Sequence, residues 1–117
     1  MAALTPRDLL EQVVAACAYS VVVEAYTLRI LDPDILSLRV HLADGSFIEV
    51  FYNTMTDRTA FALIVEGQRV YGKDNAKIGW HMHPASDPKA HHPCESASFE
   101  EFLAEVVVLR FPAGDAR

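Results

Sequence analysis

Four of the five histidines of this 117-residue chain lie within twelve positions, and a cysteine follows closely. These residues are His81, His83, His91, His92 and Cys94. Imidazole and thiolate groups bind zinc and similar metals, and imidazole also exchanges protons near neutral pH. Composition alone would seldom place so many histidines together. If the chain performs chemistry, we expect it in residues 72–94, which we name the histidine segment.

The first hypothesis is a metal site. His81 and His83 are two residues apart, so on an extended backbone both rings lie on one side. His91, His92 and Cys94 can supply further ligands, enough for a tetrahedral site of mixed nitrogen and sulfur that would hold zinc or another divalent transition metal. Adjacent His91 and His92 cannot both point inward from a regular strand, so one of them would not bind. The spacing resembles no established zinc module.

The second hypothesis is acid–base catalysis without a metal. Two histidines, one neutral and one charged, suffice as base and acid to cleave RNA through its own 2′-hydroxyl. Lys73 or Lys77 would stabilise the phosphate in the transition state, Asp74 would orient an imidazole, and Asn75 would donate to a phosphoryl oxygen. Trp80 would stack on a base. The candidate catalytic residues are therefore His81, His83, His91, Asp74, Asn75 and Lys73.

The third interpretation gives the histidine segment a purely structural role. Asp74-Asn75 then forms a turn, the His-Pro dipeptides at 83–84 and 92–93 are extended loop, and Trp80 covers the edge of the core. The residues leave all three interpretations open.

The elements that must position this segment are two helices and a set of strands. Thr5, Pro6 and Asp8 are typical of a helix start, and Ser98 and Glu101 form a capping box before a second helix that ends near Pro112. Between them, alternating or β-rich runs predict strands at residues 20–31, 36–43, 47–52, 59–66 and 69–71. The expected fold is α+β, an antiparallel meander of four or five strands with the N-terminal and C-terminal helices packed on one face.

One turn decides which side chains face the core. Asp44-Gly45 favours a hairpin, but a two-residue loop would turn Glu49 inward, whereas a three-residue bulged loop would turn Ile48 and Val50 inward. The sequence permits both. In either case the second face of the sheet must be solvated or used by a partner, and a second copy of the chain, giving a homodimer through the sheet, is one such partner.

Composition limits the remaining possibilities. With 51% hydrophobic residues, 117 residues fit a single domain spanning 1–117. The N-terminal apolar run is interrupted by Asp8 and Glu11 and is too short for a signal sequence or a membrane span, so we expect a cytoplasmic protein without a membrane partner. Cys17 and Cys94 provide no disulfide framework. The net charge of −6 disfavours broad electrostatic capture of nucleic acid, although residues 69–95 are locally less acidic.

The order of strands, the Asp-Gly turn, the run from Val70 to Ala76, the histidine pairs and the closing helix resemble the TumE-like family of small toxin–antitoxin proteins. The resemblance covers roughly residues 35–110. Position by position it singles out Asp74 and Asn75, then the histidine pairs 81 and 83, and 91 and 92. Lys73 and Cys94 depart from the family pattern. The resemblance implies a toxin that a co-encoded DNA-binding antitoxin neutralises, with RNA as the target.

The function predicted from sequence is therefore a toxin-like endoribonuclease that uses its histidine cluster. The alternative, from a different class, is a non-enzymatic module that binds a metal or another protein through a His/Cys site.

Overall fold

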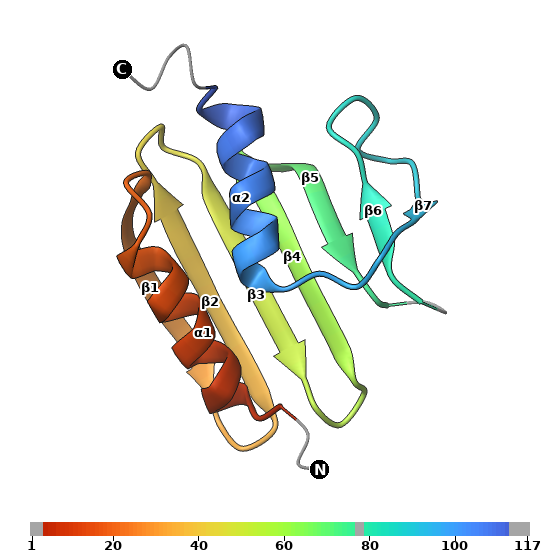
Figure 1. Cartoon of the computed structure of the whole chain (residues 1–117). Helices are drawn as coiled ribbons and strands as arrows, with labels where there is room; N and C mark the ends of the chain where they lie inside the picture. The colour runs from red at the N-terminus through yellow and green to blue at the C-terminus, as the bar shows by residue number, and fades with distance from the viewer. Residues whose placement is uncertain (1–3, 77–78, 113–117) are drawn as a thin grey trace.

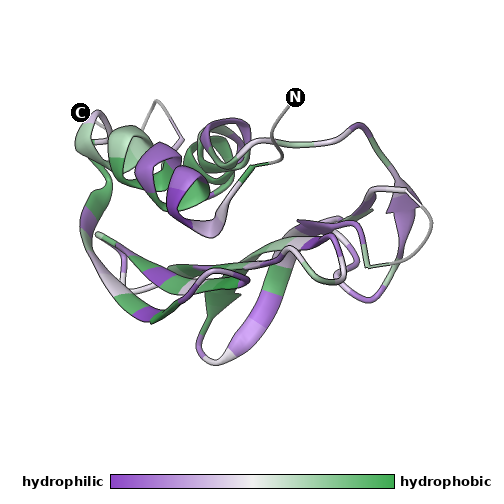
Figure 2. Cartoon of the chain, turned by 90° about the horizontal axis from the view of Figure 1, so that it is seen from below, coloured by the Kyte–Doolittle hydropathy of each residue, from purple (hydrophilic) through white to green (hydrophobic). Residues whose placement is uncertain are grey.

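The computed structural model describes residues 4–76 and 79–112, in which two helices form one layer and an antiparallel sheet forms the other (Figures 1 and 2). In chain order the elements are α1 (Pro6–Ala18), β1 (Val23–Leu31), β2 (Ile35–Leu42), β3 (Phe47–Asn53), β4 (Arg58–Val65), β5 (Gln68–Asp74), β6 (His81–His83), β7 (His92–Pro93) and α2 (Phe99–Arg110). Each strand pairs with the next one, from β1 to β7.

The α+β class and the position of the helices agree with the sequence prediction, but the strand count does not. Seven strands form the sheet in the described residues, not four or five. The additional strands, β6 and β7, have three and two residues and lie in the histidine segment. Strands this short cannot show a sustained two-residue alternation, so the sequence did not predict them.

Both helices begin where the sequence predicts, and each begins with a capping box. The Asp8 amide donates to the Thr5 hydroxyl and the Thr5 amide donates to the Asp8 carboxylate, each at 3.0 Å. Ser98 and Glu101 make the same reciprocal pair at 2.9 and 3.1 Å. Each box satisfies amides that the first helical turn leaves unpaired. The described residues contain no helix with the length and apolar character needed to cross a membrane.

The hairpin between β2 and β3 takes the second of the two predicted registers. The Leu42 amide donates to the Ser46 carbonyl at 2.9 Å, which leaves a three-residue loop whose glycine, Gly45, has a φ of +88°. Ile48 and Val50 are consequently buried beneath the helices. Glu49 points to the other face of the sheet, where it pairs with Arg39 at 3.0 Å.

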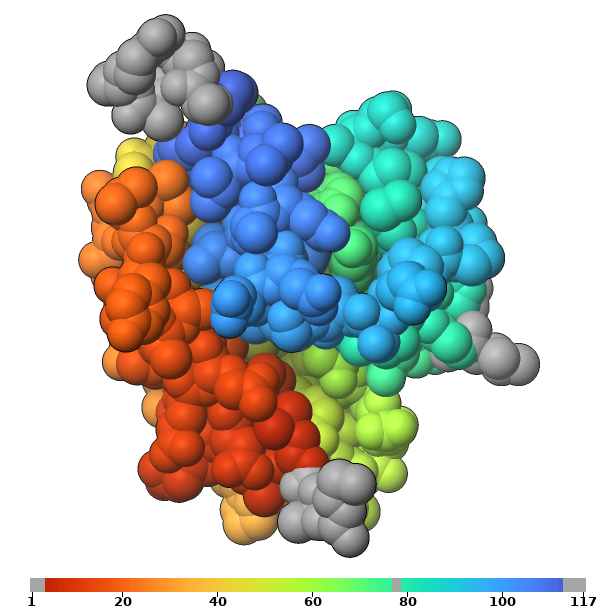
Figure 3. Space-filling model, in the orientation of Figure 1, coloured from red at the N-terminus to blue at the C-terminus, as the bar shows by residue number. Residues whose placement is uncertain are grey.

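The core lies between the sheet and the helices. It is built from alternate residues of β2, β3 and β4 together with one side of each helix. Phe61 lies at its centre, with ring centroids 5.9 Å from Phe99, 5.6 Å from Phe102 and 6.3 Å from Trp80. In Figure 3 the two helices lie side by side, and residues around β6 and β7 form a separate lobe beside α2.

Candidate functional site

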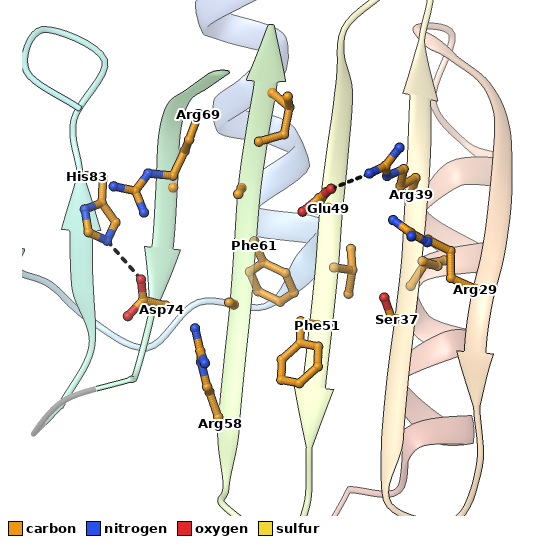
Figure 4. A pocket seen from close by; sticks show the side chains of 16 residues that line it. Arg29, Ser37, Arg39, Glu49, Phe51, Arg58, Phe61, Arg69, Asp74 and His83 are labelled. Carbon is orange, nitrogen blue, oxygen red and sulfur yellow. Dashed lines mark hydrogen bonds and ion pairs between the residues drawn. The ribbon is translucent and has the colours of Figure 1, made fainter. Parts of the chain in front are cut away.

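The face of the sheet that the helices leave open carries a hollow of about 440 Å³ (Figure 4). Its ionisable lining residues are Arg29, Arg39, Arg58, Arg69, Glu49, Asp74 and His83. Four of the ten Lys and Arg residues therefore lie around one hollow in a chain whose net charge is −6. This concentration makes the hollow suited to an anionic ligand.

Small residues explain why the hollow exists. Ala60, Ala62 and Gly72 occupy neighbouring positions on β4 and β5, where larger side chains would fill the surface. A Cβ atom on Gly72 would lie 3.1 Å from the Phe61 carbonyl oxygen and 3.3 Å from Cδ of Arg69. Only glycine fits there without displacing a neighbour.

Asp74 and His83 form a hydrogen-bonded pair at one end of the hollow. The antiparallel pairing of β5 with β6 places Gly72 opposite His83 and Asp74 opposite His81, so these side chains share the open face. His83 Nε2 lies 2.9 Å from Asp74 Oδ2, and the Ala76 amide donates to Asp74 Oδ1 at 3.0 Å. The His83 residue is only 2% exposed.

The surroundings of Asp74 keep its carboxyl group ionised. Burial by itself would raise the pKa of Asp74, but the hydrogen bonds from Ala76 and His83 and the charges of His83 and Arg58 together lower it below its ordinary value of 3.8. An ionised carboxylate can only accept a hydrogen bond. His83 Nε2 must therefore carry a proton, and in the neutral ring Nδ1 is the basic nitrogen.

Two further imidazoles lie beside this pair. The His91 ring is edge-on to His83 at 4.4 Å between centroids and to His81 at 6.4 Å. The Nδ1 atoms of His81 and His83 are buried and have no hydrogen-bond partner among the described residues. The structure thus brings together His81, His83, His91 and Asp74 of the candidate catalytic residues.

Lys73 lies on the opposite face. Adjacent residues of a strand point to opposite sides, so Lys73 turns toward the helices when Asp74 faces the hollow. Its ammonium group pairs with Glu105 of α2 at 2.7 Å. Lys77, the other lysine considered for phosphate binding, lies outside the described residues.

Asn75 braces the backbone. Its side-chain oxygen accepts from the Thr59 amide at 2.7 Å, and its side-chain nitrogen donates to the Asp57 carbonyl at 2.8 Å. The NH₂ group that the sequence prediction assigned to a phosphate is thus bonded to the backbone, so Asn75 acts here as the turn residue of the structural interpretation.

The five predicted metal ligands do not all lie at one site. His92 pairs with Met82, whose neighbours His81 and His83 face the other way. Burial, partly opposed by the charge of Lys73, raises the pKa of the Cys94 thiol and so disfavours the thiolate that a metal binds. Within residues 4–76 and 79–112, no group of three or more His, Cys, Asp or Glu side chains is arranged to hold a metal ion.

The arginines of the hollow are the site residues that sequence reasoning missed. They are Arg29, Arg39, Arg58 and Arg69. Each falls in a strand, and Arg39 occupies a polar position of the clearest alternating run. That pattern places Arg39 on the open face, but the other three arginines lie in strands whose alternation is less regular.

We expect Asp74 to stabilise the fold above acidic pH. Its pKa in the folded protein is below 3.8, so the contribution is present at neutral pH and is lost as the pH falls through the folded pKa. Asp74→Asn should therefore remove part of the stability at pH 7 and have a diminishing effect toward low pH. Chemical denaturation of both proteins over a pH series measures this; a stability difference that grows on acidification would contradict it.

The fold and the site together define an α+β protein with an arginine-lined hollow and an Asp–His pair on the open face of its sheet. Comparisons of the chain with protein-family models, curated proteins and solved structures find no match.

Proposed function

We propose that this protein is a toxin-like endoribonuclease that cleaves RNA by metal-free acid–base catalysis. The observation that carries the proposal is the buried His83 imidazole, held through Nε2 by an ionised Asp74 and positioned at the edge of an arginine-lined hollow. A histidine with a fixed tautomer near cationic groups can supply the base and the charge stabilisation for phosphodiester transfer. A cytoplasmic location and neutralisation by an antitoxin protein belong to the same proposal.

In the proposed reaction, His83 Nδ1 takes the proton of the ribose 2′-hydroxyl. The 2′-oxygen attacks the neighbouring phosphorus, the bond from phosphorus to the 5′-oxygen breaks, and the leaving oxygen receives a proton from a second imidazole. His91 is suited to the second role because it is exposed and lies against His83. His83 Nδ1 is buried, so the surrounding chain must move before a substrate can reach it.

Arg58 and Arg69 would stabilise the phosphate. Arg58 is close enough to Asp74 for its charge to lower the pKa of that carboxyl group. The Arg69 side chain lies beside Gly72, which is opposite His83, and Figure 4 shows its guanidinium next to the His83 ring. Guanidinium groups make paired hydrogen bonds with phosphate oxygens and stabilise the charge that develops in the transition state.

The proposal is tested with purified protein that carries no His tag. We expect cleavage of RNA to continue in excess chelator and to leave a 2′,3′-cyclic phosphate, because the nucleophile is the substrate's own hydroxyl. A substrate with 2′-deoxyribose at every position should not be cleaved. Activity lost in chelator and restored by zinc would favour the metal-dependent alternative, and cleavage of the deoxy substrate would exclude the proposed mechanism.

A further inference from the structure

Two rows of paired residues cross the open face of the sheet and end at His81 and His83. One row contains Ser37, Phe51, Ala60, Asp74 and His81, and the other contains Arg39, Glu49, Ala62, Gly72 and His83. Paired residues of antiparallel strands present their side chains on the same face. Each row is therefore a line of neighbouring side chains that runs across the strands from β2 to β6.

The middle of both rows carries small side chains, and larger side chains stand on either side of it. Ala60, Ala62 and Gly72 form the floor, with the Asp74–His83 pair at one end. The residues Phe51 and Glu49 rise on β3 at the other side, with Arg39 beyond them. The hollow is consequently a trough, which lies across the strands.

The far end of the trough forms a second cationic group. Arg29, Ser37 and Arg39 line it, and Figure 4 shows the two guanidinium groups near each other on the side away from His83. Arg39 pairs with Glu49, and its Nε is buried without a hydrogen-bond partner among the described residues. Since Arg39 already balances the Glu49 carboxylate, Arg29 supplies the excess positive charge at this end.

The separation of the two ends determines the kind of ligand. Neighbouring strands are ~4.8 Å apart, so β2 and β6 are separated by four such spacings, ~19 Å. A ligand with one phosphate cannot contact both ends. Between them lies the Phe51 ring, an aromatic surface with the Arg58 guanidinium positioned over it, 5.6 Å from the ring centroid. Such a surface stacks on an unpaired base and is inaccessible to the bases of a duplex.

We propose that the trough binds one unpaired RNA strand laid across the β-strands. The strand places its scissile phosphate at His83, a base on Phe51, and a second phosphate at Arg29 and Arg39. The assignment of the scissile end rests on the proposed function, whereas the second phosphate subsite rests on the trough itself.

Binding of single-stranded DNA tests this inference independently of cleavage, because DNA lacks the 2′-hydroxyl and stays intact. Affinity for the wild-type protein should rise with length from a dinucleotide to about eight nucleotides, within the range of known single-strand sites. Arg29→Gln should bind the dinucleotide like wild type but bind the octanucleotide several-fold more weakly. The slope of log affinity against log salt should fall by ~0.7, the value for one lost phosphate contact on a single strand.

Arg7→Gln is the matched control, since it removes the same charge from α1 on the other layer. It should bind both oligonucleotides like wild type. Phe51→Leu should weaken binding of the octanucleotide by on the order of tenfold, because base–aromatic stacking contributes ~1–3 kcal/mol per base. Circular dichroism verifies that each variant is folded.

The inference is overturned if duplex RNA of equal length binds as tightly as the single strand, or if Arg29→Gln leaves the octanucleotide affinity and salt slope unchanged. Length-dependent binding without RNA cleavage by the wild-type protein would support the trough and refute the nuclease. If the protein cleaves RNA but its affinity does not depend on strand length, the nuclease is supported and the trough is refuted.

Discussion

Asp74→Asn is expected to reduce the rate of RNA cleavage by about two to four orders of magnitude, the usual contribution of an oriented general base. Asp74 Oδ1 already accepts the Ala76 amide, so the asparagine oxygen will occupy that position and its NH₂ group will face His83 Nε2. Nε2 then becomes the acceptor, and the proton moves to Nδ1. The imidazole remains in place, but its basic nitrogen points the wrong way.

Two controls separate this effect from a general loss of structure. Asp34→Asn makes the same chemical change in the exposed turn between β1 and β2 and should leave cleavage unchanged. His41→Gln removes a histidine of the open face that is hydrogen-bonded to Thr27 at 2.9 Å and lies outside the trough, and it should also be active. His83→Gln should be as impaired as Asp74→Asn.

The decisive readout is the pH dependence of the cleavage rate. The wild-type cleavage rate should fall at low pH, where the base is protonated, and at high pH, where the acid is deprotonated. Asp74→Asn should lose the dependence at low pH that reports the base. An Asp74→Asn protein that is folded and cleaves RNA within a few-fold of the wild-type rate would show that the Asp–His pair is structural.

Phe61→Ala is the second large expected effect and concerns stability. Truncating a buried phenylalanine typically costs about 3–5 kcal/mol, out of a total unfolding free energy of roughly 5–15 kcal/mol. Phe61 is 2% exposed and its ring contacts Phe99 and Phe102 of α2 as well as Trp80. The substitution therefore weakens the attachment of α2 and of the chain leading to β6 at the same time.

Urea denaturation followed by circular dichroism measures this loss. Phe61→Leu is the graded control, because it keeps much of the buried volume and should cost less than the alanine variant. A loss below about 1.5 kcal/mol for Phe61→Ala would mean that the aromatic cluster rearranges to fill the cavity and is not the central support of the site.

The sequence predicts the scaffold well because its signals are local. Reciprocal capping residues mark both helix starts, and the strict alternation from Leu36 to Leu42 marks a strand with one buried face. The register of β3 could not be predicted, because Asp44-Gly45 is compatible with two loop lengths. That choice alone decides whether Glu49 lies in the core or beside Arg39.

The candidate site is less predictable because it depends on pairing between distant residues. His81 and His83 could be assigned to one side by their spacing, but their meeting with Asp74 requires β5 to pair with β6. Treating residues 72–94 as a loop also concealed that Lys73 and Asp74 are adjacent strand residues and must point in opposite directions. The arginines of the trough come from four strands, whose alignment no local pattern specifies.

The position of β6 and β7 also bears on how the molecule moves. These short strands form the end of the sheet, beside α2 and not beneath it (Figure 1). Peripheral segments with few buried contacts detach and re-form at a lower free energy than the central strands. Local opening of β6 and β7 would expose His83 Nδ1 while the hydrophobic core stays folded. Mild warming, well below the melting temperature, should therefore accelerate the proposed cleavage of RNA.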